Sequence, residues 1–147
     1  MTNGARMIFP NIAVKDLDRS VKFFEELGFS FDPRFTDENA AAMIVNEQAV
    51  VMLLKEDFFK TFTRKELVDP AKQVESIIAL SAESREDVDA FADKALEIGG
   101  SPANDPVEMD FMYGRSFEDP DGHHWEIFWM DMEAVEQQGA AAAAAGA

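Results

Sequence analysis

One carboxylate, Glu126, is the strongest candidate for chemistry in this sequence. It follows a turn-forming stretch rich in Asp, Pro and Gly, and it belongs to residues 124–130, where bulky side chains alternate as in a half-buried strand. With a period of two, His124, Glu126 and Phe128 share one face of that strand. A carboxylate among aromatic side chains must be paired, hydrogen-bonded, protonated or metal-bound. Glu126 is therefore either a functional group, catalytic or metal-binding, or one half of a structural ion pair.

The composition limits the classes of partner. A chain of 147 residues with 47% hydrophobic residues is expected to fold as one domain. Its net charge of −16, from 13 basic and 29 acidic residues, argues against nucleic acid and membrane surfaces as partners. The absence of cysteine excludes disulfides, thiol catalysis and cysteine-ligated metals. We expect an untargeted cytoplasmic protein, because the first ten residues lack the apolar core of a secretory signal.

The hydrophobic pattern describes two similar halves. In each half a short strand leads to an amphipathic helix, whose apolar stripe runs from Leu17 to Leu27 in the first half and from Val88 to Leu96 in the second. Each helix stops at glycine, Gly28 or the pair Gly99 and Gly100. Ser84 resembles an N-cap for the second helix. The first strands are expected at residues 8–14 and 77–81, and further strands at 30–35, 41–46, 49–55, 111–118 and 124–130. This order predicts an α+β fold.

Two segments fall outside these halves. Residues 57–73 include Phe58, Phe59 and Phe62 among charged residues, which predicts a short amphipathic helix, a linker or a lid; exposed aromatics there would also suit a dimer contact. Residues 137–147 form an Ala-rich tail, expected to be disordered or a frayed helix end.

Two motifs give the sequence a family resemblance. They are Val-Lys-Asp-Leu-Asp-Arg-Ser at residues 14–20, followed by Phe-Phe and Leu-Gly-Phe, and Asp-Pro-Asp-Gly-His-His-Trp-Glu at residues 119–126. In both, the chain resembles the vicinal oxygen chelate superfamily, which includes glyoxalase I, bleomycin-resistance proteins, fosfomycin-modifying transferases and extradiol dioxygenases. The resemblance implies a single domain over residues 7–132, made of two βαβββ modules at about 7–56 and 74–132. Their strands would form a curved mixed β-sheet around a cleft, usually in a homodimer.

The same resemblance places metal ligands on four strands. In metal-dependent members, His and Glu side chains bind Fe, Mn, Ni or Zn. The corresponding positions here are Phe9, Met52, the strand around Ile77 and Ala79, and Glu126. Of these, Glu126 alone has a ligand-type side chain. We therefore expect no cofactor. A divalent metal stays an alternative, because a shift of one residue would turn other side chains toward the cleft.

The expected cleft is apolar with a few polar groups, as in small-molecule sites. Its predicted residues are Phe9, Asn11, Met52, Leu54, Ile77, Tyr113, Arg115, His124, Glu126 and Phe128. Arg115 could pair with Glu126 or with an anionic ligand. His124 and Glu126, at positions i and i+2, are about 7 Å apart along a strand, too far for ordinary shared chelation. His123 is expected to be exposed in the turn.

These observations leave several functions open. The first is a metal-free protein of the bleomycin-resistance type, which would sequester an aromatic or cationic small molecule. The second is an enzyme. It would be a metal-dependent enzyme, such as a glyoxalase-like lyase or isomerase or an extradiol dioxygenase, or an enzyme that uses Glu126 as a general base. The third is an interaction module without catalysis. One fold supports many chemistries, so the resemblance alone does not choose among them.

Overall fold

The computed structural model describes residues 6–145, and the chain divides into two compact units. Unit 1 comprises the residues up to Glu75 together with Asp119–Gly122. Unit 2 comprises Ser76–Glu118 and the residues from His123 onward. Helices and strands occur in both units, which confirms the predicted α+β class.

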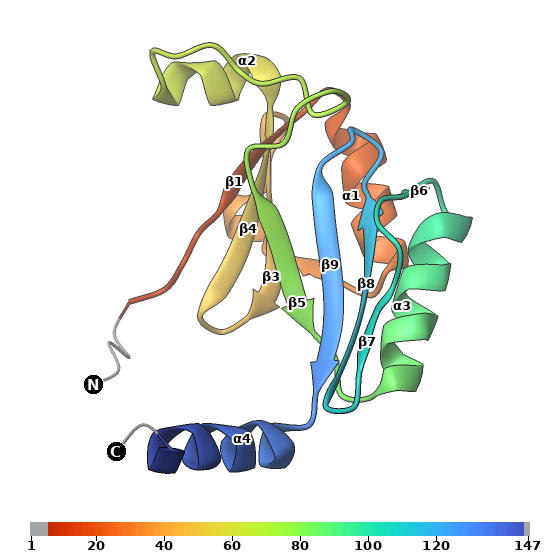
Figure 1. The fold of residues 1–147 in the computed structure, drawn as a ribbon. Helices are drawn as coiled ribbons and strands as arrows, with labels where there is room; N and C mark the ends of the chain where they lie inside the picture. Colours follow the sequence, from red (N-terminus) through yellow and green to blue (C-terminus); the bar gives the residue numbers. More distant parts are fainter. Residues whose placement is uncertain (1–5, 146–147) are drawn as a thin grey trace. The chain divides into compact units, whose positions relative to one another are not determined.

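Unit 1 contains one four-stranded sheet with the order β1-β4-β3-β2 (Figure 1). Its elements are β1 (Asn11–Val14), α1 (Leu17–Glu26), β2 (Ser30–Phe31), a 3-10 turn η1 (Pro33–Phe35), β3 (Ala40–Asn46), β4 (Ala49–Lys55), α2 (Glu56–Phe59) and a 3-10 turn η2 (Lys60–Phe62). β1 runs parallel to β4, and the other neighbours are antiparallel. The β-α-β-β-β order predicted for the first half is confirmed.

Local sequence explains the bounds of α1. The Asp16 side chain accepts a hydrogen bond from the Arg19 N–H at 3.1 Å and so caps the first turn. At the other end, Gly28 has φ of 105°, a conformation that costs glycine little. Between these two points Phe23 and Phe24 are buried on one side of the helix. The predicted start and stop of this helix are both confirmed.

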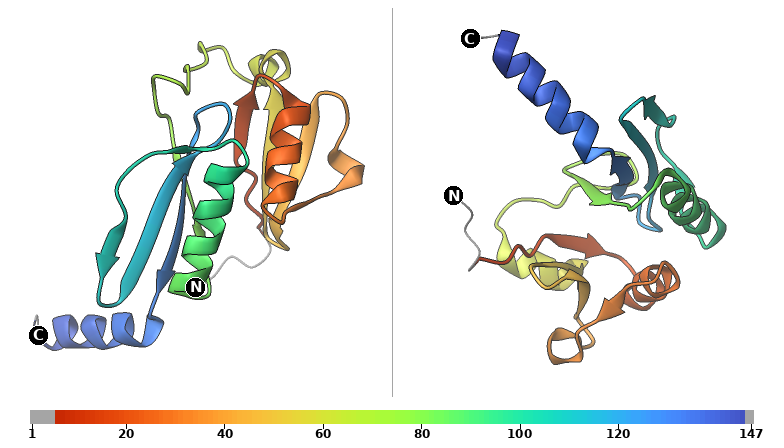
Figure 2. Two further views of the ribbon diagram at one scale, coloured as in Figure 1. Left: turned by 90° about the vertical axis from the view of Figure 1, so that its right-hand side faces the viewer. Right: turned by 90° about the horizontal axis from the view of Figure 1, so that it is seen from below.

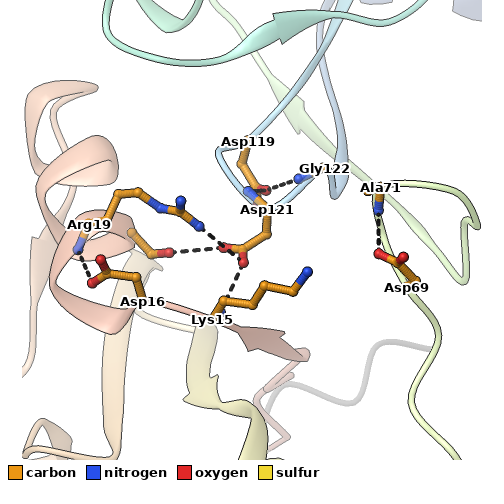
Figure 3. Close-up of polar contacts among 9 residues, drawn as sticks. Lys15, Asp16, Arg19, Asp69, Ala71, Asp119, Asp121 and Gly122 are labelled. Carbon is orange, nitrogen blue, oxygen red and sulfur yellow. Dashed lines mark hydrogen bonds and ion pairs between the residues drawn. The ribbon is translucent and has the colours of Figure 1, made fainter.

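The turn Asp119–Gly122 belongs to unit 1 through a buried carboxylate (Figure 3). Asp121, whose side chain is 1% exposed, accepts hydrogen bonds from the Lys15 N–H at 2.9 Å, the Arg19 guanidinium at 3.3 Å and the Ser20 hydroxyl at 3.2 Å. Gly122 closes the turn with φ of 103°. A single acid therefore fixes this turn to the start of α1.

Unit 2 contains a sheet with the order β5-β9-β8-β6, and β7 also pairs with β8 (Figure 2). Its elements are β5 (Ile77–Ser81), α3 (Arg85–Glu97), β6 (Ser101–Pro102), β7 (Val107–Met109), β8 (Met112–Glu118), β9 (His124–Met130) and α4 (Met132–Ala145). The Ser84 hydroxyl accepts a hydrogen bond from the Asp87 N–H, which confirms the predicted N-cap of α3. β5 and β9 have the predicted bounds.

α3 packs on one face of this sheet. Val88 and Ala92 of the helix form a buried cluster with Ile127 of β9. Partly buried side chains extend the cluster, and they include Leu80, Phe91, Tyr113 and Trp129. Because side chains alternate along a strand, the neighbours of these sheet residues point to the other face.

Two parts of the chain differ from the strand predictions. Residues 30–35 are only briefly a strand, because Pro33 lacks an N–H and the Asp32 side chain caps the 3-10 turn that follows. β6 and β7 were not predicted. In the Ala-rich segment, α4 continues as a helix to Ala145, and residues 146 and 147 lie outside the described part. No helix over residues 6–145 combines the length and apolarity needed to cross a bilayer.

Candidate ligand-binding site

The face of the unit 2 sheet that points away from α3 carries the candidate site. Strand register places Ser116 opposite Glu126 and Gly114 opposite Phe128. Ala79 of β5 is in turn the partner of Glu126 on its other side. Paired residues project to the same side of a sheet, so these five positions share one face. The expectation that Glu126 and Phe128 lie on a common face is confirmed.

A cavity of about 250 Å³ opens on this face. Apolar groups form most of its wall, among them Ala79, Val107, Met112, Phe128 and Met130. Two acidic residues, Asp105 and Glu126, also line it. The adjoining loop is held in place because the Asn104 N–H donates to the Ser116 hydroxyl at 2.8 Å. The cavity thus combines adaptable apolar walls with two carboxylates, a composition suited to a small amphiphilic ligand.

Tyr113 and Arg115 point toward α3 instead. The Tyr113 hydroxyl donates to Asp89 at 2.6 Å, and the Arg115 guanidinium donates to Asp89 at 3.0 Å and to Asp93 at 2.8 Å. These residues are one position out of phase with Ser116 on β8, so their side chains emerge on the helix side. The pairing of Arg115 with Glu126 considered from the sequence is therefore wrong.

This cluster changes the titration of its members. The hydrogen bond from Tyr113 lowers the pKa of Asp89, and the nearby Arg115 charge acts in the same direction. The same hydrogen bond, assisted by burial, raises the pKa of Tyr113 above its usual value. The cluster joins α3 to β8 as an electrostatic contact within unit 2.

Glu126 has a partner on its own strand. Its Oε2 lies 3.4 Å from Nε2 of His124, and the two side chains are 40% and 15% exposed. The 7 Å expected from strand spacing describes the backbone positions, whereas the side chains bend toward each other. Glu126 and His124 thus form the kind of structural ion pair considered from the sequence when the His124 ring is protonated. His123, expected to be exposed, is buried.

The remaining predicted residues divide between the units. In unit 1, Asn11 is the β-sheet partner of Met52, and its amide nitrogen donates to the Phe9 carbonyl at 2.7 Å. Phe9 is 50% exposed, whereas Leu54 is buried. In unit 2, Ile77 is 55% exposed and is paired with His124. Two pairs of predicted residues are therefore neighbours in a sheet, Asn11 with Met52 in unit 1 and Ile77 with His124 in unit 2.

The donor side chains do not fit a divalent metal ion. Over the described residues 6–145, no three His, Asp or Glu side chains lie close enough together to hold one. His124 and Glu126 supply two donors, fewer than the three protein ligands of ordinary catalytic sites. Phe9, Met52 and Ile77, at the other positions that the resemblance indicates, offer no carboxylate or imidazole.

Sequence reasoning missed one side of the cavity. Asn104, Asp105 and Val107 were not predicted to contribute, although they line it. The Asn-Asp-Pro sequence at residues 104–106 is a turn signal that marks a loop before a strand. The signal could have identified the loop, but β7 is only three exposed residues long, so the hairpin that it forms with β8 beside the cavity was not predicted.

Comparisons with known proteins agree on the fold. A profile described as Glyoxalase/Bleomycin resistance protein/Dioxygenase superfamily matches residues 6–127. A hypothetical protein, SA1046, from S. aureus is 28% identical, with a TM-score of 0.72 over 88% of this chain and 94% of that one. A glyoxalase-related enzyme from Fulvimarina pelagi is 18% identical, with a TM-score of 0.71 over 84% and 87% of the two chains. The fosfomycin resistance protein FosX from Mesorhizobium loti is 16% identical, with a TM-score of 0.63 over 88% and 93%. None of the curated proteins compared with the chain is a match.

Proposed function

We propose that this chain, which belongs to the glyoxalase/bleomycin resistance protein/dioxygenase superfamily, binds a small amphiphilic cation without a metal. The observation that carries this proposal is the unit 2 cavity, where apolar walls surround Asp105 and Glu126. A protonated amine would pair with the carboxylates, and an aromatic or aliphatic body would cover the methionine and phenylalanine side chains. Sequestration of such a compound in the cytoplasm is the corresponding biological role.

Charge supports a cationic ligand over an anionic one. Arg115 is the sole basic residue at the cavity among the described residues, and its guanidinium already binds Asp89 and Asp93. The net charge of −16 also raises the local concentration of cations near the whole protein. An anion in this cavity would meet two carboxylates with no free cation to balance them.

Binding of phenethylamine, compared with the neutral analogue 2-phenylethanol, tests the proposal. We expect phenethylamine to raise the melting temperature and 2-phenylethanol to have a smaller effect, because the alcohol lacks the charge. Glu126→Gln should weaken phenethylamine binding about three- to tenfold, since one partly exposed charge pair contributes roughly 1 kcal/mol. The matched control is Glu136→Gln, which removes an exposed charge on α4 outside the cavity. Equal binding of the two probes, or equal effects of the two substitutions, would contradict the proposal.

Metal independence is tested separately. Elemental analysis of purified protein, repeated after incubation with Fe, Mn, Ni and Zn and desalting, should find far less than one metal ion per chain. Near-stoichiometric metal that is lost in Glu126→Ala would instead support the metalloenzyme class.

The contact between His124 and Glu126 favours a second candidate, an enzyme that uses Glu126 as a general base. An imidazole within 3.4 Å can orient the carboxylate and exchange a proton with it. Carbonyl compounds with α-hydrogens, incubated with the protein in D₂O, would then exchange those hydrogens for deuterium. The exchange should be lost in Glu126→Gln while ligand binding persists.

A homodimer is the proposed assembly. Met7, Ile8 and Phe9 lie next to each other with large exposed apolar areas, which are unusual on a monomer surface. Light scattering coupled to size-exclusion chromatography measures the mass directly. A mass of one chain at micromolar concentration would rule the dimer out.

A further inference from the structure

A second cavity, in unit 1, has the opposite electrostatic character. It measures about 600 Å³ and lies between the start of α1 and the segment after β4. Four basic residues line it, namely Lys15, Lys60, Arg64 and Lys65. Three acids, Glu56, Glu66 and Asp69, also line it. The lining therefore has a small net positive charge.

Most of these basic side chains have no ion-pair partner among the described residues. Over the part of the chain that the structure describes, the Lys15 ammonium and the side chains of Arg64 and Lys65 take part in no ion pair or hydrogen bond. Lys60 contacts Asp57 at 4.0 Å, and both side chains are well exposed, so this pair contributes little. In Figure 3 the Lys15 side chain extends with its ammonium away from Asp121, to which Lys15 donates only its backbone N–H. Three cations at one cavity thus have no partner among the described residues.

Two of the three acids at this cavity already interact with nearby backbone groups. One oxygen of Asp69 accepts a hydrogen bond from the Ala71 N–H at 3.1 Å. Glu56 lies in the first turn of α2, where the helix dipole favours its negative charge. Neither contact neutralises Arg64 or Lys65. An anion that enters the cavity would supply the missing counter-charge.

The charge of the whole chain makes this location unusual. Residues 55–72 contain five basic and four acidic residues, a net charge of +1 in a chain with −16 overall, so the remainder carries −17. An anion is repelled by most of the molecule and meets a favourable potential near this segment. Arg64 can also bind an oxyanion through two parallel N–H donors.

We propose that the unit 1 cavity binds a small anion with two or more negative charges, through Lys15, Arg64 and Lys65. The chemistry common to its possible sources is a cluster of phosphate or carboxylate oxygens. This site is independent of the proposed cation site in unit 2, so failure of either proposal leaves the other standing.

Isothermal titration with inorganic pyrophosphate and with citrate, at constant ionic strength, tests the site and distinguishes phosphate from carboxylate ligands. The double substitution Arg64→Gln and Lys65→Gln should weaken binding at least tenfold. Lys15→Gln should weaken it at least threefold, although Lys15 is remote in sequence. Urea unfolding of each variant checks that the fold is kept, since all of these side chains are exposed.

A matched control separates a site from general charge. The double substitution Lys22→Gln and Lys94→Gln also removes two positive charges, but from exposed positions on α1 and α3. It should change the affinity for either anion less than twofold. Equal weakening by the two double variants would overturn the proposal in favour of a nonspecific charge effect. Absence of binding of both anions to the unsubstituted protein, or unchanged affinity in Lys15→Gln, would overturn it as well.

Discussion

At the scale of single residues, Asp121 has an unusual environment for a charged side chain. Its carboxylate is almost inaccessible to water and accepts hydrogen bonds from a backbone N–H, a guanidinium and a hydroxyl. A buried charge is tolerated only when such donors replace its hydration. The residue that makes the turn recognisable in the sequence is thus also the one that fixes the turn to Lys15, Arg19 and Ser20.

Asp121→Ala should therefore destabilise the protein strongly. We expect a loss of about 2–4 kcal/mol, because three donors lose their acceptor at a buried position. Urea unfolding measures this loss, and hydrogen exchange of the Lys15 amide should become faster. The control is Asp57→Ala, which removes a fully exposed carboxylate and should have no measurable effect. Similar midpoints for the two variants would show that the Asp121 contacts contribute little.

Residue types identified Glu126 but could not identify all of its surroundings. Alternation along one strand correctly placed His124, Glu126 and Phe128 on the same face, since the period of two is local. Alternation does not tell which face of β8 lies beside Glu126. The pairing of Ser116 with Glu126 sets this face. As a result, the neighbouring Arg115 projects to the other face and bonds to α3. The contribution of Asp105 was missed because β7 was not predicted.

At the scale of elements, the cluster of Asp89, Asp93, Tyr113 and Arg115 joins α3 to β8. The hydrogen bond from Tyr113 is short, at 2.6 Å, although the Asp89 side chain is about half exposed. Solvent screening limits the contribution of such a group to stability. The cluster therefore matters more as a directional contact that orients the helix than as a large source of free energy.

The titration of Tyr113 reports on this contact directly, because Tyr113 is the single tyrosine of the chain. Tyrosinate absorbance should show a midpoint above the ordinary value near 10, since the bond to Asp89 holds the proton. Asp89→Asn should bring the midpoint back toward that value. Asp93→Asn is the control, because Asp93 bonds to Arg115 and not to Tyr113. An unchanged midpoint in Asp89→Asn would mean that the hydrogen bond is absent in solution.

The two pKa shifts also fix the sign of the pH dependence. Folding lowers the pKa of Asp89, so its contribution to stability is present above about pH 4 and is lost as the pH falls through the folded value. Folding raises the pKa of Tyr113, so that contribution is complete below about pH 10 and is lost as the pH rises through the folded value. The contact is therefore fully effective between these limits.

Elements with strong local signals were predicted well, and those that depend on partners were not. α1 and α3 have caps, apolar stripes and terminal glycines within their own sequences. β4 and β9 combine bulky residues over seven positions. β6 and β7 are two and three exposed residues long and exist through their pairing with β8, so their own residues carry little information.

At the scale of the whole molecule, the excess of acidic residues opposes folding. A net charge of −16 on 147 residues produces self-repulsion that is stronger in the compact state than in the expanded unfolded chain. Several of the observed ion pairs are exposed and offset this repulsion only slightly. Stability must come mainly from the apolar cores, which include Phe24 and Leu53 in unit 1 and Val88 and Trp125 in unit 2.

Salt should consequently stabilise the protein at neutral pH. Raising NaCl from 20 to 500 mM shortens the Debye length from about 20 Å to about 4 Å and screens the repulsion among distant carboxylates. We expect the free energy of unfolding at pH 7.5, measured with urea, to rise with salt. Near the isoelectric point, determined by isoelectric focusing, the repulsion vanishes and the same salt increase should have a much smaller effect. A comparable increase of the unfolding free energy at both pH values would mean that salt acts on apolar burial instead. A decrease at pH 7.5 would mean that attractive ion pairs outweigh the repulsion from the net charge.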